Sequence, residues 1–288
     1  MKKIGILTNF NVPEKADTAR KAAYQASLAG ATPLFPVYAS QNRALADSLK
    51  AYNAEYLPLN DLYRTSDAVF CVGGDGSVIE AAKRAAECGI PVLGINRGRI
   101  GYITELEPAE LERIPEIIEG NYRIEKRFLM KAEILRDGAV QKSAVVLNDA
   151  VLSNGYSGKV LDLRFAEGSE TIAEYRADGM ILSTPTGSTA YSLSAGGPVI
   201  DCRMECFCAT PICPHSPAAR PMIYPGTAVL DLSNGSNRNP EAIITLDGKF
   251  FGKLQKNDIL RISDAGLRAG LVRIKPMKYY QSLCRKLD

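Results

Sequence analysis

The residues best suited to chemistry lie in a glycine-rich turn at residues 73–77, which read Gly-Gly-Asp-Gly-Ser. The apolar run at 67–72 has the content of a buried strand, and the apolar residues after the turn fall on one helical face. Ser77 and Glu80 have the spacing of a capping box, which predicts that a helix begins just after Gly76. Free amides at a helix start suit phosphate. Asp75 would repel phosphate, so it needs another role, such as holding a metal ion or taking a proton from an attacking hydroxyl.

A second stretch, residues 178–197, is rich in hydroxyl side chains. Seven serines and threonines lie between Ser183 and Ser194, around Pro185 and Gly187. We expect a loop rather than a part of the core, because small residues let backbone amides and hydroxyls approach a sugar or a phosphate without steric cost. The alternative is a surface turn that binds nothing.

A third candidate is the pair Asn148-Asp149, which follows the apolar residues 143–147. Asn and Asp can donate and accept hydrogen bonds at neighbouring positions, as the paired hydroxyls of a ribose require. The same pair is common in turns, so the local sequence leaves both interpretations open.

The elements that must position these stretches fall into two parts. In the first hundred residues, strand-like and helix-like segments alternate, which predicts a parallel sheet covered by helices, with ligands at the carboxyl ends of its strands. One more helix is expected at 109–119, and short strands follow it. The sequence therefore predicts an α/β fold, with one domain at 1–101 plus the tail 266–288 and a β-rich domain at 102–265.

The β-rich part is marked by apolar, β-branched segments with turn signals between them. Strands are expected at 128–135, 144–152, 159–165, 227–232 and 242–246. Hairpin signals are Asp137-Gly138, Asn154-Gly155 and Asp247-Gly248. The tail, 272–288, ends in a sequence that suits a short helix packed on the first domain.

Composition sets broad limits on function. The chain has 288 residues, of which 46% are hydrophobic and 23% charged, and this suits two ordinary domains. A net charge of +3 gives no basic stripe for nucleic acid and leaves small anionic ligands possible. No run of about 18 apolar residues occurs, so we expect no membrane helix. Seven cysteines without a secretory signal favour reduced thiols in the cytoplasm.

Four cysteines, at 202, 206, 208 and 213, crowd near His215 and could suggest zinc. No CxxC pair occurs, however, and Cys206-Phe207-Cys208 alternates like a strand with both sulfurs on one face. We therefore interpret these cysteines as core thiols, and His215 as structural because no nucleophile is paired with it.

In this order, the three stretches resemble bacterial NAD kinases. The turn at 73–76 alone is shared with phosphofructokinases and with diacylglycerol and sphingosine kinases, whereas the signature at 184–191, Thr-Pro-Thr-Gly-Ser-Thr-Ala-Tyr, is specific. Residues 176–179 and 210–215 also match, while 201–208 match less well. Neither GxxxxGK[ST] nor GxGxxG is present.

The resemblance implies a Rossmann-like or phosphofructokinase-like N-terminal domain, a β-sandwich-like C-terminal domain, and an active site in the crevice between them. It implies transfer of the γ-phosphoryl group of ATP to the 2′-hydroxyl of the adenosine ribose of NAD, giving NADP. A divalent cation, Mg²⁺, would be bound mainly through ATP rather than by protein ligands. The enzyme would be a homodimer or homotetramer with a site shared between subunits.

The resemblance also assigns roles to residues. Asp75 would be the catalytic group, accepting or orienting the proton of the acceptor hydroxyl. Asn148 and Asp149 would bind the ribose, and Arg176 and Asp178 a dinucleotide held largely by the neighbouring subunit. Thr189, Ala190, Tyr191 and Ser194 would contact the adenine and nicotinamide ends. The full set expected to bind NAD or ATP is Gly73, Gly74, Gly76, Ser77, Asn148, Asp149, Arg176, Asp178, Thr186, Gly187, Ser188, Thr189, Ala190, Tyr191, Ser192, Leu193 and Ser194.

Two other interpretations differ in what they explain. A lipid or sugar kinase of the Gly-Gly-Asp-Gly type accounts for the first motif and leaves the stretch at 184–191 unexplained. A non-catalytic NAD-binding sensor accounts for a nucleotide pocket, and the presence of Asp75 speaks against it.

Overall fold

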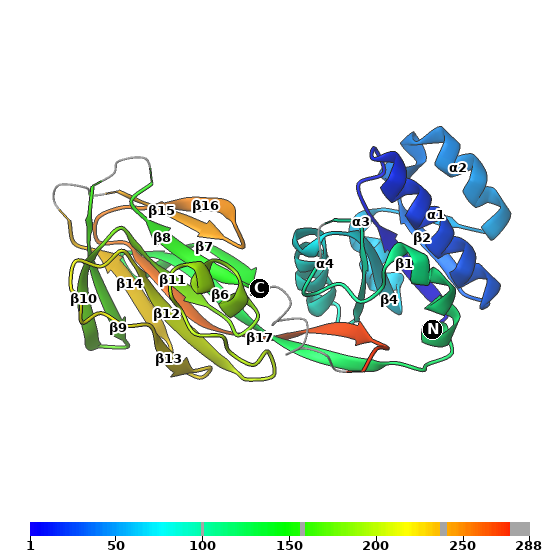
Figure 1. Cartoon of the computed structure of the whole chain (residues 1–288). Coiled ribbons are helices and arrows are strands. Elements are labelled where there is room, and N and C mark those ends of the chain that lie inside the picture. The colour runs from blue at the N-terminus through cyan, green and yellow to red at the C-terminus, as the bar shows by residue number, and fades with distance from the viewer. Residues whose placement is uncertain (99–100, 156–158, 237–240, 277–288) are drawn as a thin grey trace. The chain divides into compact units, whose positions relative to one another are not determined.

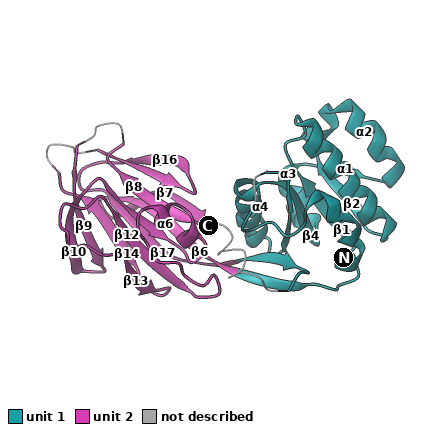
Figure 2. Ribbon diagram, viewed as in Figure 1, with its two compact units in different colours: residues 1–126, 269–288 teal, residues 127–268 magenta. Residues whose placement is uncertain are grey.

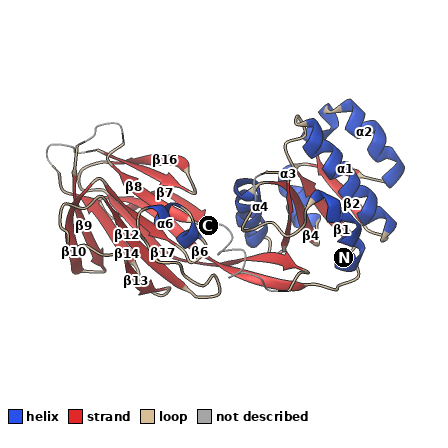
Figure 3. Ribbon diagram, viewed as in Figure 1, coloured by secondary structure: helices blue, strands red, loops and turns tan. Residues whose placement is uncertain are grey.

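The computed structural model describes residues 1–98, 101–155, 159–236 and 241–276 (Figure 1). The chain forms two compact units, of which unit 1 comprises residues 1–126 and 269–288 and unit 2 comprises residues 127–268 (Figure 2). Most helices belong to unit 1, whereas unit 2 consists largely of strands (Figure 3).

Unit 1 is built on a parallel sheet in the strand order β5-β4-β1-β2-β3. Its elements are β1 (Lys3–Leu7), α1 (Pro13–Leu28), β2 (Thr32–Pro36), η1 (Val37–Gln41), α2 (Arg43–Leu49), η2 (Lys50–Tyr52), β3 (Glu55–Leu57), α3 (Leu59–Thr65), β4 (Ala68–Gly73), α4 (Asp75–Glu87), β5 (Val92–Asn96), η3 (Pro108–Arg113) and α5 (Ile114–Ile118). The α/β prediction is therefore confirmed for this part of the chain.

Helices cover both faces of this sheet, as the side chains of β1 show. Ile4 and Ile6 are fully buried in a core that includes the alanines of α1. Gly5 faces the other way, and a Cβ there would lie 2.5 Å from the Cδ2 atom of Leu62 in α3. Alternation along the strand thus separates the two helical layers.

Residues 102–126 pack with unit 1, so the division of the chain lies later than the sequence boundary at 101/102. Leu106, Leu111, Ile114 and Ile117 are buried in the same core as the alanines of α1. The helix expected at 109–119 forms as η3 followed by α5. These apolar side chains complete the core of unit 1, and the strands of unit 2 follow them in the chain.

Helix α4 begins earlier than predicted. It starts at Asp75 with Gly74 as N-cap and without a side-chain cap, so the expected capping box is wrong. The carboxylate of Glu80 pairs with Lys83 at 2.8 Å instead of reaching back to the helix start. The backbone N–H of Val78 donates to the carbonyl of Gly74 at 3.2 Å, which places Asp75 in the first turn.

Unit 2 is a sandwich of two sheets, and within each sheet the strands of this unit pair antiparallel. Its elements are β6 (Arg123–Arg136), β7 (Ala139–Val146), β8 (Asp149–Ser153), β9 (Leu161–Glu167), β10 (Glu170–Ala177), β11 (Gly179–Ser183), η4 (Gly187–Thr189), α6 (Tyr191–Ser194), β12 (Cys206–Ile212), β13 (Met222–Pro225), β14 (Leu230–Asn234), β15 (Ala242–Leu246), β16 (Lys249–Leu254) and β17 (Ile259–Arg273), the first and last of which also contain residues of unit 1. One sheet has the order β13-β12-β11-β8-β15-β16 and the other β7-β6-β17-β14-β9-β10. Side chains from both, such as Leu182 and Phe165, share one core.

Two of the three hairpin signals are confirmed. Asp137-Gly138 joins β6 to β7 and Asp247-Gly248 joins β15 to β16, and all four residues have the positive φ of a type I′ turn. The prediction at Asn154-Gly155 is wrong, because β8 pairs with β11 and β15 whereas β9 pairs with β10 and β14. The chain changes sheets there instead of turning back.

Two sequence-based expectations concern the chain's tail and membranes. The helix expected near the end of 272–288 falls mainly on residues 277–288, which lie outside the described residues. Within the described ranges, none of the helices combines the length and the hydropathy needed to span a bilayer.

Candidate functional site

The glycine-rich turn after β4 places Asp75 at the first position of α4. Its carboxylate accepts hydrogen bonds from two backbone amides, those of Tyr102 at 2.8 Å and Ile103 at 3.1 Å. Each carboxylate oxygen therefore has one N–H donor from the chain that follows β5. The side chain is held in one orientation at the carboxyl ends of two neighbouring parallel strands.

Glycines line the backbone around Asp75, and Gly98 and Gly101 leave little or no room there for a side chain. A Cβ on Gly98 would lie 3.2 Å from the Cα of Gly74, and one on Gly101 would lie 2.5 Å from the Oδ1 atom of Asp75. The N–H of Arg97 donates to the carbonyl of Gly73 at 3.0 Å. The loops after β4 and β5 thus lie against each other and form one glycine-lined wall.

In unit 2, the predicted strand at 144–152 is interrupted at Leu147-Asn148, where the chain crosses from one sheet to the other. The carboxylate of Asp247 accepts hydrogen bonds from the backbone amides of Leu147 and Asn148, the second at 2.7 Å. The amide of Asp247 donates to the carbonyl of Asp149 at 2.9 Å. We call residues 147–148 the crossover. The sequence predicts Asp247 only as a turn residue, because the amides that it accepts lie about 100 positions earlier in the chain.

Asp149 is a buried carboxylate beside this crossover, only 5% exposed. Burial raises its pKa to about 7, and the negative charge of Asp247 adds to the rise. Asp149 lies directly opposite Ser183 in the pair β8–β11. The hydroxyl of Ser183 is fully buried and makes no hydrogen bond within the described part of the chain.

The hydroxyl-rich loop at 184–194 packs on the crossover. The hydroxyl of Thr184 donates to the carbonyl of Leu147, and the amide of Thr184 donates to the carbonyl of Asn148 at 2.9 Å. A Cβ on Gly187 would lie 2.0 Å from the carbonyl oxygen of Asn148. Asn148, Asp149 and the loop are therefore brought together.

Most hydroxyls of the loop have structural partners, which corrects the expectation that the stretch lies outside the core. The hydroxyl of Ser188 donates to the carbonyl of Pro185, and that of Ser192 bonds to Thr210 at 2.9 Å. Ser183, Thr184, Ser188 and Ser192 are fully buried. Thr186 is also buried and accepts a hydrogen bond from Arg127 at 3.3 Å.

The accessible part of the loop is its far end. Tyr191 is 48% exposed and Ser194 is exposed, while Thr189, Ala190 and Leu193 are half-buried. These residues can meet a ligand, whereas the buried hydroxyls fix the shape of the loop beneath them.

Arg176 and Asp178 lie apart from the loop. Asp178 precedes β11 and Thr184 follows it, so strand geometry of about 3.3 Å per residue separates them by about 20 Å. Arg176 pairs with Asp162 at 3.1 Å, and Asp178 accepts a hydrogen bond from the side chain of Asn154 at 3.2 Å. One chain therefore does not bring these two residues to the crossover.

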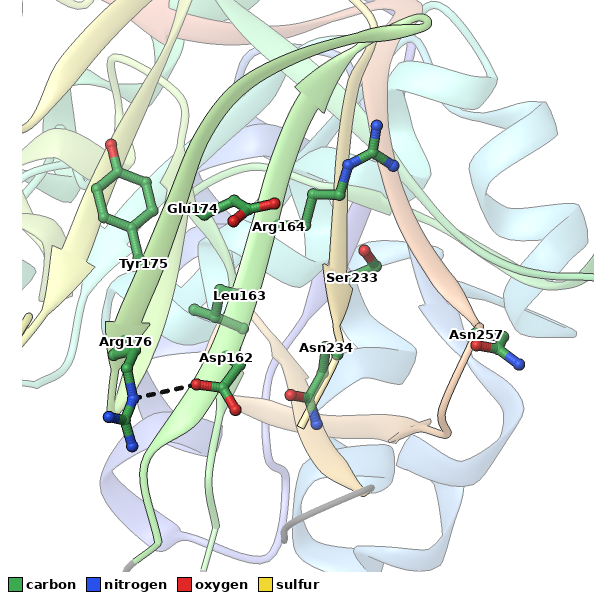
Figure 4. A pocket seen from close by; sticks show the side chains of 10 residues that line it. Asp162, Leu163, Arg164, Glu174, Tyr175, Arg176, Ser233, Asn234 and Asn257 are labelled. Atoms are coloured by element: carbon green, nitrogen blue, oxygen red, sulfur yellow. Dashed lines mark ion pairs between the residues drawn. The ribbon is translucent and has the colours of Figure 1, made fainter. Parts of the chain in front are cut away.

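A cavity of about 650 Å³ opens beside Arg176 on the sheet that contains β9, β10 and β14 (Figure 4). Its ionised side chains are Asp162, Arg164, Glu174 and Arg176, with Ser233, Asn234 and Asn257 along the other side. Arg176 is the one predicted site residue in its lining, so this cavity does not coincide with the crossover or the Asp75 turn.

The cysteine cluster behaves as part of a core. Cys206 and Cys208 are buried and pack with Ile200, while Phe207 between them faces the sandwich core. Burial raises the pKa of Cys206 to about 11, which keeps it a neutral thiol. Cys213 is exposed. Among the residues that the structure describes, no group of three or more histidines, cysteines or carboxylates could hold a metal ion.

Comparison with known proteins gives consistent matches. The model of the ATP-NAD kinase N-terminal domain matches residues 4–122, and that of the ATP-NAD kinase C-terminal domain matches residues 147–274. An NAD kinase of Heliobacterium modesticaldum is 34% identical, covering 100% of this chain and 99% of the relative. An NAD kinase of Symbiobacterium thermophilum is 39% identical over 77% of this chain and 78% of its own.

Solved structures share the fold. Yeast NADH kinase, solved with NADH, has a TM-score of 0.87 at 21% identity and covers 100% of this chain and 87% of its own. An NAD kinase of Archaeoglobus fulgidus, solved with ATP, has a TM-score of 0.67 at 21% identity, covering 100% of this chain and 98% of its own.

Proposed function

Since the chain belongs to the ATP-NAD kinase family and phosphorylates NAD, we propose that Asp75 is the group that meets the acceptor hydroxyl. The reaction moves the γ-phosphoryl group of ATP to the 2′-hydroxyl of the adenosine ribose, giving NADP and ADP. The observation that carries this role is the carboxylate of Asp75, held by two backbone amides beside Gly101, where a Cβ would collide with it. Such a fixed carboxylate can orient the hydroxyl and accept its proton.

The backbone around Asp75 serves the phosphates in this proposal. Gly74 and Gly76 are not buried and have no side chain to keep a phosphate from the backbone, whereas Gly73 is buried at the end of β4. The thirteen-residue helix α4 adds its positive end. Hydrogen bonds from the backbone amides of Tyr102 and Ile103 hold the carboxylate of Asp75 away from the free N–H groups at the start of α4. Donor phosphate and acceptor hydroxyl can then approach from different sides, as in-line transfer requires.

Asn148 and Asp149 are proposed to bind the ribose hydroxyls. The crossover backbone is fixed by Asp247 and Thr184, so the side chains that project from it are preorganised. The accessible end of the loop, Thr189, Ala190, Tyr191 and Ser194, is proposed for the adenine and nicotinamide ends of NAD.

Mg²⁺ is proposed to reach this site as a partner of ATP. Among the described residues, no group of three or more histidines, cysteines or carboxylates that could hold a metal ion includes Asp75. When bound through the phosphates of ATP, the cation supplies positive charge that offsets the charge of the transferred group. The protein's own contribution is the glycine wall and the orientation of Asp75.

We further propose a cytoplasmic homodimer or homotetramer in which Arg176 and Asp178 serve the dinucleotide of the partner subunit. The separation of about 20 Å along β11 supports this sharing, because one chain's Asp178 cannot lie beside its own loop. The odd number of cysteines suits a reducing compartment.

The role of Asp75 is tested by Asp75→Asn, with Asp67→Asn as a matched control. Asp67 also accepts backbone amides, including that of Lys3 at 3.0 Å, but precedes β4 at the opposite end of the strand. NADP formation from NAD, ATP and Mg²⁺ should fall by at least about 100-fold in Asp75→Asn and stay unchanged in Asp67→Asn. Substantial activity in Asp75→Asn would remove Asp75 from the proposal.

A further inference from the structure

Arg273 ends β17 with its guanidinium buried inside unit 1, 7% exposed. The guanidinium donates to the carbonyl of Ile103 at 3.0 Å and to the carboxylate of Glu105 at 3.1 Å. It also donates twice to one oxygen of Glu125, at 3.2 and 3.1 Å. These three side chains, Arg273, Glu105 and Glu125, are called the Arg273 network.

The network clamps the chain that follows β5. The other oxygen of Glu105 accepts hydrogen bonds from the amides of Ile274 at 2.9 Å and Lys275 at 2.7 Å. The amide of Glu105 donates to the carbonyl of Gly94 at 2.8 Å. Residues 103–105 are thereby fixed both to the sheet and to the returning C-terminal strand.

The clamped segment is the one that holds Asp75. The N–H of Ile103 donates to Asp75 while the carbonyl of the same residue accepts from Arg273. Gly101 adds a steric limit, since a Cβ there would collide with the carboxylate of Asp75. A shift of this segment therefore moves the two amide donors relative to the carboxylate.

We propose that the Arg273 network is a positioning device for the carboxylate of Asp75, acting through the amides of Tyr102 and Ile103. The inference rests on the catalytic role of Asp75 proposed above. A buried guanidinium with two buried carboxylates adds little stability over apolar side chains of similar size. The network contributes by fixing positions, because a planar guanidinium can donate hydrogen bonds to a carbonyl and two carboxylates at fixed angles.

The kinetic test is Arg273→Lys, which keeps the charge but cannot span the same acceptors. The control is Arg136→Lys, because Arg136 makes a bidentate pair with the buried Asp258 in unit 2 and touches neither Asp75 nor its segment. Well below the unfolding temperature, kcat should fall by about 10- to 100-fold in Arg273→Lys while KM for NAD and for ATP stays within about twofold. The control should keep its kcat.

The second readout is hydrogen–deuterium exchange, which does not depend on catalysis. In Arg273→Lys, the amides of Tyr102 and Ile103 should exchange faster, while those of β1 and α1 keep their protection. A unit-wide rise in exchange would indicate a purely stabilising role and would overturn the inference. Should Arg273→Lys not fold, Glu105→Gln tests the same clamp with a smaller change.

The outcomes distinguish this inference from the proposed function. An unchanged kcat in Arg273→Lys, with Asp75→Asn inactive, overturns the positioning role alone. Activity retained in Asp75→Asn overturns the role of Asp75 and, with it, the catalytic meaning of the network.

Discussion

Two carboxylates of this chain work in opposite surroundings. Asp75 is held by two backbone amides at the end of a parallel sheet, whereas Asp149 is buried opposite a serine hydroxyl that lacks a hydrogen-bond partner within the described residues. Amide donors fix the orientation of the first. Burial raises the pKa of the second to about 7, so Asp149 changes charge near neutral pH.

This difference predicts a pH-dependent stability. The folded-state pKa of Asp149 is raised above its unfolded value of 3.8, so folding binds a proton between about pH 4 and pH 7. The stability linked to this proton is present below pH 4 and is lost as the pH rises through about 7. Asparagine carries no charge at any pH, so Asp149→Asn does not suffer this loss of stability. At pH 8 the variant should be more stable than the parent by up to about 4 kcal/mol, which is the rise in pKa from 3.8 to about 7 at 1.36 kcal/mol per pKa unit.

Urea unfolding at pH 6 and pH 8 measures this effect. The stability difference between Asp149→Asn and the parent should grow with pH. Asp137→Asn, at an exposed turn with the same backbone conformation that asparagine accepts, serves as the control and should leave the pH dependence of the parent unchanged. Parallel curves for the parent and Asp149→Asn would show that Asp149 is not the titrating group.

Sequence alone identified the residues that belong to short motifs and missed those that support them from far away. Asp75 and Asn148-Asp149 stand in recognisable local patterns. Asp247 and Arg273 act on residues about 100 and 170 positions earlier in the chain, and the residues next to them carry no sign of these partners. Spacing rules reach only along one helix or one strand, so such supports become visible only in the folded chain.

At the scale of elements, the loop at 184–194 and the crossover form one assembly. Thr184 bonds to both Leu147 and Asn148, and Gly187 leaves no room for a side chain against the carbonyl of Asn148. The threonine-rich signature is thus explained in part by packing. Its buried hydroxyls replace the hydrogen bonds that an irregular buried backbone would otherwise lack.

Gly187→Ala should separate the loop from the crossover. A Cβ placed 2.0 Å from the carbonyl oxygen of Asn148 must push the two backbones apart. We expect a loss of stability of about 1–3 kcal/mol and a higher KM for NAD, because the residues proposed to bind the ribose move. Thermal unfolding and initial rates measure both effects.

Gly235→Ala is the matched control in the same unit. The nearest atom to its Cβ would be the carbonyl oxygen of Asp162 at 3.7 Å, an ordinary contact. A KM for NAD that rises equally in both variants would contradict the specific role of Gly187.

The helix start shows why local rules fall short at a site. Ser77 and Glu80 satisfy the capping-box pattern, yet α4 begins at Asp75. The close approach of the β5 loop to Gly74 and Asp75 decides the local conformation, since Arg97 and Tyr102 supply backbone donors there. Tertiary contacts thus override a capping preference worth only about 1 kcal/mol.

At the scale of the whole molecule, the sequence correctly indicated an α/β part and a β-sandwich part. Alternating strand and helix patterns identified the parallel sheet of unit 1. Residues 102–126 belong to unit 1, although they contain short irregular elements whose apolar side chains give no period of their own. The sequence also does not show which strands of unit 2 share a sheet, since strands that follow each other in the chain, such as β8 and β9, belong to different sheets.

The proposed sharing of sites between subunits predicts complementation. Asp75→Asn and Asp178→Ala should each be inactive or strongly impaired as pure proteins. After mixing and reassembly of a dimer, half of the molecules carry both variants, and one of their two sites contains Asp75 together with Asp178 of the partner subunit. Activity should recover to roughly a quarter of the parent value. No recovery, with exchange of subunits verified, would place both residues in one chain's site.

The crossover at Leu147-Asn148 has a consequence for how this chain can vary in length. Successive residues of β8 face opposite sides, so Ala150 lies in the sandwich core while Asp149 faces away from it. A slip of β8 by one residue against β11 and β15 would exchange these positions and put a carboxylate into the apolar interior. The length of the two-residue link between the sheets therefore matters for the register of β8, because too short a link would pull the strand along by one position.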